Sequence, residues 1–109
     1  MEFDLSQIKL SSKDIKRGLV LPNYFSKDLA EFIGILAGDG FINHYKDKNL
    51  YIMDIAGDKK LDKEYLEVYV KNLIKRLFNI ECKIYYKKNQ NSVEVRVLSK
   101  GLYNYLLLE

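Results

Sequence analysis

The stretch 32–40 constrains this chain more than any other, because it combines an uncharged helical run with a single carboxylate at its end. Ala30, Gly34 and Gly38 recur every four residues, so on a helix they form a ridge with almost no side chains, where another backbone can approach closely. Each glycine costs about 1 kcal/mol of helix stability relative to alanine. A run without charged positions also needs cover on more than one side. The pattern therefore predicts a covered helix that packs closely along this ridge.

Asp39 stands at the end of the run, where the helix dipole is already negative and a cation would be favoured by about 0.3–1 kcal/mol. One interpretation is a bound divalent cation, since hard cations take carboxylate and carbonyl oxygens. The other is an ordinary turn that stops the helix, with Gly40 as a left-handed cap. The residues of this stretch leave both interpretations open.

The composition is that of one globular domain. The chain has 109 residues, with 48% hydrophobic and 30% charged, which is enough to bury a core. No apolar run approaches the ~18 residues of a membrane span and no signal-peptide pattern is present, so we expect a cytoplasmic protein. The single cysteine, Cys82, excludes an intrachain disulfide, and the single histidine, His44, lacks the neighbours of a catalytic triad. The formal charge of +3 permits a polyanionic partner without requiring one.

Hydrophobic periodicity predicts an α+β fold in which helix-strand-strand occurs twice and a last helix follows. We expect helices at 26–38, 62–79 and 99–108, and strands at 41–46, 50–56, 81–88 and 93–98. Ser26 and Ser99 are predicted to cap the first and last of these helices. In the second helix, the predicted apolar face consists of Leu66, Tyr69, Val70, Leu73, Leu77 and Phe78. Residues 1–25, which contain the only proline, Pro22, are predicted to be a basic lead-in segment with a short capped helical turn at 12–18. This lead-in would pack loosely on a single domain of residues 26–109.

Strand alternation assigns two faces to the predicted sheet. In the last two strands, the face toward the helices would carry Cys82, Ile84, Tyr86, Val93, Val95 and Val97. The opposite, open face would carry Lys83, Tyr85, Lys87, Glu94 and Arg96. This open face is either a solvated sheet surface or, with an aromatic ring among its cations, a surface for a phosphate backbone and base edges.

The stretch 32–40 resembles the motif of the LAGLIDADG homing endonucleases. The residues in the expected places are Gly34, Ile35, Leu36, Gly38, Asp39 and Gly40. Phe32 and Ile33 replace the opening Leu-Ala, and Ala37 stands at the first acidic position. The predicted element order is also that of the family's core, αββαββα with a four-stranded antiparallel sheet covered by helices on one face. The resemblance therefore covers residue 26 to the C-terminus. The stretches 14–22, 55–58, 62–66 and 73–78 are also similar to segments of archaeal members.

For a chain with one motif, this resemblance implies a homodimer in which two copies of the first helix pack through Ala30, Gly34 and Gly38. Two Asp39 carboxylates, with Gly38, would then bind Mg²⁺, which activates water and stabilises the charge on each scissile phosphate. The dimer would cut double-stranded DNA at a pseudo-palindromic site. From strand parity, the candidate DNA-binding residues are Lys83, Tyr85, Lys87 and Arg96.

Two departures from the family pattern leave other functions open. A basic residue beyond the third helix usually supports the active site, and this chain ends at Glu109 before any such position. Gly57 stands where a polar side chain often positions water. A catalytically degenerate DNA-binding module is therefore one alternative to a Mg²⁺-dependent endonuclease. An assembly domain, in which the glycine ridge only mediates dimerisation, is another.

Overall fold

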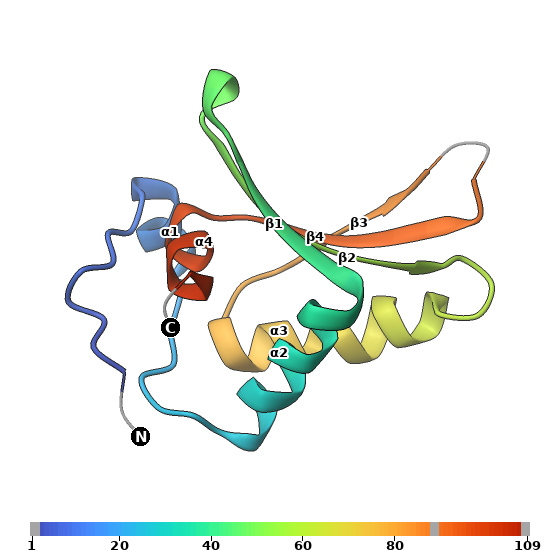
Figure 1. The fold of residues 1–109 in the computed structure, drawn as a ribbon, viewed down its shortest axis with the longest axis horizontal. Coiled ribbons are helices and arrows are strands. Elements are labelled where there is room, and N and C mark those ends of the chain that lie inside the picture. The colour runs from blue at the N-terminus through green and yellow to red at the C-terminus, as the bar shows by residue number, and fades with distance from the viewer. Residues whose placement is uncertain (1–2, 88–89, 108–109) are drawn as a thin grey trace.

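The computed structural model describes residues 3–87 and 90–107, which form an α+β fold with the predicted element order (Figure 1). A helix in the lead-in, α1, precedes this order, a 3₁₀ turn, η1, joins the first two strands, and a π-helical turn, η2, opens the second helix. The elements are α1 Ser12–Arg17, α2 Lys27–Asp39, β1 Gly40–Tyr45, η1 Lys46–Lys48, β2 Leu50–Asp58, η2 Tyr65–Val70, α3 Lys71–Phe78, β3 Lys83–Tyr86, β4 Ser92–Leu98 and α4 Lys100–Leu106.

The four strands form one antiparallel sheet in the order β1-β2-β4-β3. Ile55 on β2 pairs with Gly40 on β1 and with Val95 on β4, and Val95 also pairs with Ile84 on β3, so the two hairpins join along β2 and β4. Figure 1 shows α2 and α3 on one side of this curved sheet, and none of the described α-helices lies over the opposite side. The predicted fold class, a four-stranded antiparallel sheet covered on one face, is confirmed.

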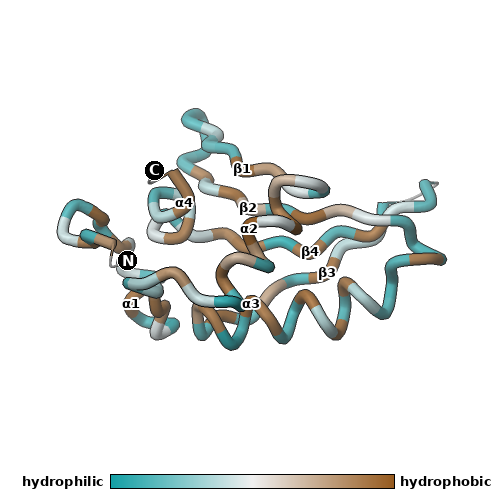
Figure 2. Tube along the Cα trace, turned by 60° about the horizontal axis from the view of Figure 1, so that its bottom comes forward, coloured by the Kyte–Doolittle hydropathy of each residue, from teal (hydrophilic) through white to brown (hydrophobic). Residues whose placement is uncertain are grey.

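The core lies between the sheet and the two central helices. Phe32 of α2 and Phe78 of α3 are fully buried and meet edge to face, with ring centroids 5.2 Å apart. Full burial of a side chain of this kind contributes about 1.5–3 kcal/mol. The apolar residues of α3 alternate with hydrophilic ones, as expected for a helix with one face on the sheet (Figure 2). The strands contribute Met53, Ile55, Val93, Val95 and Val97 to this core.

The second helix differs from the prediction in its first turns, which form the π-helical η2 before α3 begins. A π turn has a wider repeat than an α turn, so it shifts the phase of the side chains that follow. Tyr69, expected on the apolar face, is 39% exposed, whereas Ile74 is buried.

In the described part of the chain, no helix is long and apolar enough to cross a membrane.

Strand boundaries also shift. β2 continues to Asp58 because its last residues still pair with the start of β4. β3 is shorter than predicted and begins at Lys83. Of the residues predicted to end the third strand and the last helix, Lys88 and Leu108 lie outside the described residues. On β3, Ile84 is only half-buried and Tyr86, predicted to face the core, is 44% exposed, since it lies near the sheet's end.

The lead-in segment is fastened to the rest of the chain, whereas loose packing was expected. Asp14 forms a capping box with Ser11 at the start of α1. Its buried carboxylate also accepts hydrogen bonds from the Ser99 hydroxyl at 2.7 Å and from the Gly101 backbone N–H at 2.8 Å. Leu19 belongs to the hydrophobic core. The domain boundary between residues 25 and 26 stays a prediction.

Candidate functional site

The small-residue ridge of α2 is uncovered within one chain. Ala30, Gly34 and Gly38 are exposed, and a methyl group added at Gly34 or Gly38 would meet no atom within 4 Å among the described residues. Ile33, beside the ridge, is 43% exposed. Only the opposite side of the helix, with Leu29 and other apolar residues, packs into the core. The expectation that α2 is covered on more than one side is therefore wrong for a single chain.

Asp39 is the last residue of α2, and its side chain is exposed. The last turn of the helix contains no basic residue. Gly40 is extended, with φ −116°, so the predicted left-handed cap is wrong: the chain passes directly from α2 into β1. A Cβ at Gly40 would lie 2.5 Å from Leu36 Cδ1 and 3.0 Å from the carbonyl oxygen of Asp54, so close approach of the backbones explains this glycine.

Within one chain the predicted metal ligands, Asp39 and the Gly38 carbonyl, are an incomplete set. Residues 3–87 and 90–107 contain no group of three or more His, Cys, Asp or Glu side chains arranged to hold a metal ion. Divalent cations bound by hard oxygen ligands usually take several of them. Further ligands would have to come from water, substrate or a second chain.

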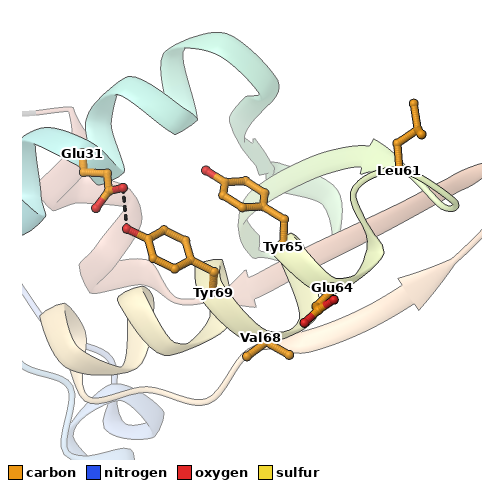
Figure 3. A pocket seen from close by; sticks show the side chains of 6 residues that line it. All are labelled: Glu31, Leu61, Glu64, Tyr65, Val68 and Tyr69. Carbon is orange, nitrogen blue, oxygen red and sulfur yellow. Dashed lines mark hydrogen bonds between the residues drawn. The ribbon is translucent and has the colours of Figure 1, made fainter.

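A cleft of about 530 Å³ lies beside α2 and is lined by Glu31, Leu61, Glu64, Tyr65, Val68 and Tyr69 (Figure 3). Tyr69 donates a hydrogen bond from its hydroxyl to Oε2 of Glu31, and the rings of Tyr65 and Tyr69 stack with centroids 5.5 Å apart. Burial, followed by the negative charges of Glu31 and Asp39, raises the pKa of Tyr65. Sequence reasoning placed Tyr69 in the core and did not find this cleft.

The open face of the sheet carries an ion-pair network at its centre. Arg96 donates to Oδ2 of Asp54 from Nε at 3.1 Å and from Nη2 at 2.9 Å, and Nη2 also donates to Oε2 of Glu94 at 3.0 Å. The Nζ of Lys87 lies 2.9 Å from Oε1 of Glu94. The guanidinium carbon of Arg96 lies 4.8 Å from the centroid of the Tyr85 ring. Two of the four predicted DNA-binding residues are therefore engaged in ion pairs, while Lys83 and Tyr85 are exposed.

Both carboxylates of this network are withdrawn from water. Asp54 is fully buried and Glu94, predicted to face solvent, is 4% exposed. The pKa of Asp54 is raised to about 6, mainly by burial. The hydrogen bonds from Arg96 act to lower this pKa, and the neighbouring Glu94 raises it further. Burial also acts to raise the pKa of Glu94, but hydrogen bonds from Lys87 and Asp54 outweigh it, and the pKa is lowered. Asp54 was missed in the sequence, where strand alternation was the only signal for its position.

Gly57 has no room for a side chain. A Cβ there would lie 2.8 Å from Leu66 Cδ1 and 2.9 Å from Cβ and Oδ2 of Asp62. Packing of β2 against the start of η2 therefore explains the glycine at a position where the family often has a polar residue.

The chain thus has an antiparallel sheet that is covered by helices on one face. The glycine ridge of its motif helix ends at an exposed carboxylate. No family model and no curated protein matches the chain. It is similar to a solved structure of an I-DmoI variant with its target DNA nicked in the coding strand and with Mn, at 30% identity over 72% of this chain and 46% of that chain, with a TM-score of 0.48. The chain is also similar to I-DmoI in complex with DNA and Mn. The identity there is 32% over 70% of this chain and 45% of that chain, and the TM-score is 0.47.

The chain thus spans less than half the length of either matched chain. I-DmoI is a LAGLIDADG homing endonuclease, the family whose motif the stretch 32–40 resembles.

Proposed function

We propose that the protein is a site-specific DNA endonuclease of the LAGLIDADG type that works as a homodimer. The observation that carries this proposal is the uncovered ridge of Ala30, Gly34 and Gly38, which leads to the exposed Asp39. Two helix glycines cost about 1 kcal/mol each, and one chain gains no close packing from them. A second copy of α2 packed on the ridge would supply that packing and would bring the two Asp39 carboxylates together.

Mg²⁺ fits the chemistry at the end of α2. Asp39 and the Gly38 carbonyl are hard oxygen donors at the negative end of a helix without a basic side chain in its last turn. When bound, such an ion supplies a Lewis acid that activates water and stabilises charge on a phosphate. Asp39 would hold the ion, and the absence of side chains at Gly38 would let the two helices, and hence the two carboxylates, approach one another.

The proposed substrate is double-stranded DNA, with the open face of each sheet toward a major groove. Tyr85 and Lys83 are exposed on this face. Arg96 is held by Asp54 through two hydrogen bonds, which fixes the plane of its guanidinium group. A planar donor with a fixed orientation is suited to recognition of base edges. Lys87, paired with Glu94, would contribute less than the sequence analysis expected.

The endonuclease is tested with supercoiled DNA that carries the flanks of the encoding gene. We expect wild-type protein with Mg²⁺ to convert it to nicked or linear DNA and Asp39→Asn to leave it intact. Asp47→Asn is the matched control, because Asp47 is an exposed aspartate in the turn between β1 and β2. Equal cleavage by wild type and Asp39→Asn would mean that Asp39 is not a metal ligand.

A DNA-binding module without catalysis is the second candidate. The lack of room at Gly57 favours it, because no polar side chain can position water there. It predicts that the wild type binds DNA without cutting it in Mg²⁺ or Mn²⁺, and that Asp39→Asn binds with unchanged affinity. Cleavage by the wild type that is lost in Asp39→Asn would exclude it.

A further inference from the structure

The centre of the open face holds little free positive charge. Two carboxylates, those of Asp54 and Glu94, are hydrogen-bonded or ion-paired to Arg96 and Lys87. A duplex carries one negative charge per about 1.7 Å of its axis, and its affinity depends on the cations that neutralise phosphates. A surface that binds a duplex therefore needs cations outside this network.

Such cations gather at one end of the sheet, in what we name the lysine cleft. It has a volume of about 920 Å³, and its lining includes Lys59, Lys60, Lys63, Tyr86, Lys87 and Asn91. None of the described residues that line it is acidic. Its lining residues follow the end of β2, lie at or just after the end of β3, or precede β4, and the end of β2 and the start of β4 lie at the right of Figure 1.

The two segments that form the cleft are tied together by hydrogen bonds. Asp58 accepts backbone hydrogen bonds from Lys60 and Leu61, at 2.8 and 2.9 Å, through Oδ1. Its Oδ2 accepts a hydrogen bond from Nδ2 of Asn91 at 2.8 Å, and the backbone N–H of Lys59 donates to the Asn91 carbonyl at 3.2 Å. The backbone that carries the lysines is therefore held in place before any ligand binds.

The lysines are crowded around one aromatic ring. The Nζ atoms of Lys59 and Lys63 lie 5.5 and 5.9 Å from the centroid of the Tyr86 ring. Lys63 has one weak partner, Glu67, at 4.0 Å. Among the described residues, neither Lys59 nor Lys60 has a carboxylate oxygen within 4.0 Å. Like charges this close repel one another, and an anion in the cleft would relieve the repulsion.

We propose that the lysine cleft binds the phosphate backbone of the duplex whose bases face the open side of the sheet, at the outer end of the bound site. This inference rests on the proposed function. Lys87 connects the two surfaces, because it lines the cleft and pairs with Glu94 of the open-face network. Ammonium groups bind phosphate as point charges, so the contact positions the protein and carries no sequence information.

The test compares two triple variants that lose the same charge. In the cleft variant, Lys59, Lys60 and Lys63 become glutamine. In the control variant, the exposed Lys9, Lys16 and Lys27, on the lead-in and α2, become glutamine. Fluorescence anisotropy with a random-sequence duplex is measured over a range of salt concentrations, and a single strand of the same sequence serves as a second probe.

We expect the cleft variant to bind the duplex at least tenfold more weakly than the control variant. Its plot of log affinity against log salt should be flatter by about 0.9 for each phosphate that the variant no longer neutralises. Equal slopes in the two variants would overturn the inference, since only net charge would then matter. So would an equal weakening of duplex and single-strand binding, which would make the cleft a general anion site. A wild type that binds no duplex at low salt would instead overturn the proposed function itself.

Discussion

Arg96 on β4 and Asp54 on β2 are cross-strand partners, and two hydrogen bonds join their side chains on the open face of the sheet. The pair lies at the centre of the surface where the sequence predicted free cations. Asp54 is fully buried. The ion pair between Asp54 and Arg96 therefore sets both the charge of this surface and the way that charge depends on pH.

Asp54 should make stability decrease as pH rises through the acid range. Its pKa is raised to about 6 in the folded chain, above the ordinary aspartate value of 3.8, so between these values the folded state binds more protons than the unfolded state. The free energy of unfolding should therefore fall by at most about 1.4 kcal/mol per pH unit over this range from this group, and level off above pH 6. Urea unfolding of wild type and Asp54→Asn between pH 4 and 7 measures the difference. Parallel curves for the two proteins would contradict the prediction.

Asp14 should stabilise the folded chain by about 3 kcal/mol at neutral pH. Asp14→Ala leaves the buried Ser99 hydroxyl and the Gly101 N–H without their acceptor, and each buried group left unpaired costs about 1–3 kcal/mol. Although burial acts to raise it, the pKa of Asp14 is lowered by hydrogen bonds from Ser99, Gly101, Arg17 and Ser11. The contribution of Asp14 to the free energy of unfolding is thus present at neutral pH. It is lost as the pH falls below the usual range of aspartate pKa values.

Chemical unfolding measures this effect, with Asp47→Asn as a control that should change stability by less than about 0.5 kcal/mol. An Asp14→Ala variant as stable as the wild type would mean that the lead-in is not fastened through this carboxylate.

Gly34→Leu should dissociate the proposed dimer without destabilising the monomer. A side chain at Gly34 meets open space in one chain, and replacing a helical glycine should stabilise α2 by about 0.5–1 kcal/mol. In the dimer, the same side chain would separate the two helices. Light scattering should give a dimeric mass for the wild type and a monomeric mass for the variant.

The matched control for that experiment is Asn72→Leu, which adds leucine at an exposed position of α3. It should leave the mass unchanged. A wild type that is monomeric at micromolar concentrations would remove the paired Asp39 site from the proposal.

Gly57→Ser should destabilise the fold by about 1–3 kcal/mol. The added Cβ would overlap Leu66 and Asp62, and overpacking at a filled site costs this much. Thermal unfolding should show a lower midpoint for Gly57→Ser than for the wild type. An unchanged midpoint would show that η2 moves easily and that packing does not require glycine here.

Local pattern was enough to predict most of the secondary structure. The caps at Ser26 and Ser99, the alternation of β4 and the order of the elements depend on neighbouring residues, which the sequence displays directly. The phase of the second helix was wrong at Tyr69, because a π turn leaves no signal in a pattern that is read with an α-helical repeat.

The candidate site was predictable in part for the same reason. The glycine ridge and Asp39 lie within one helix, so the sequence alone placed them on one stripe and at one end. That the ridge is uncovered is a property of the packed chain, since it depends on which side of α2 the sheet and α3 occupy.

The sequence by itself determined the α+β element order, the motif helix and the face on which Arg96 lies, because helix and strand periodicity act over a few residues. Only the tertiary structure decided the charge of the open face and the position of the lysine cleft. Asp54 and Arg96 are 42 residues apart, and Lys59 meets Asn91 only after β2 and β4 have paired. Charged groups form ion pairs only when they lie close together in space, and the pairing of the strands is what brings these groups close together.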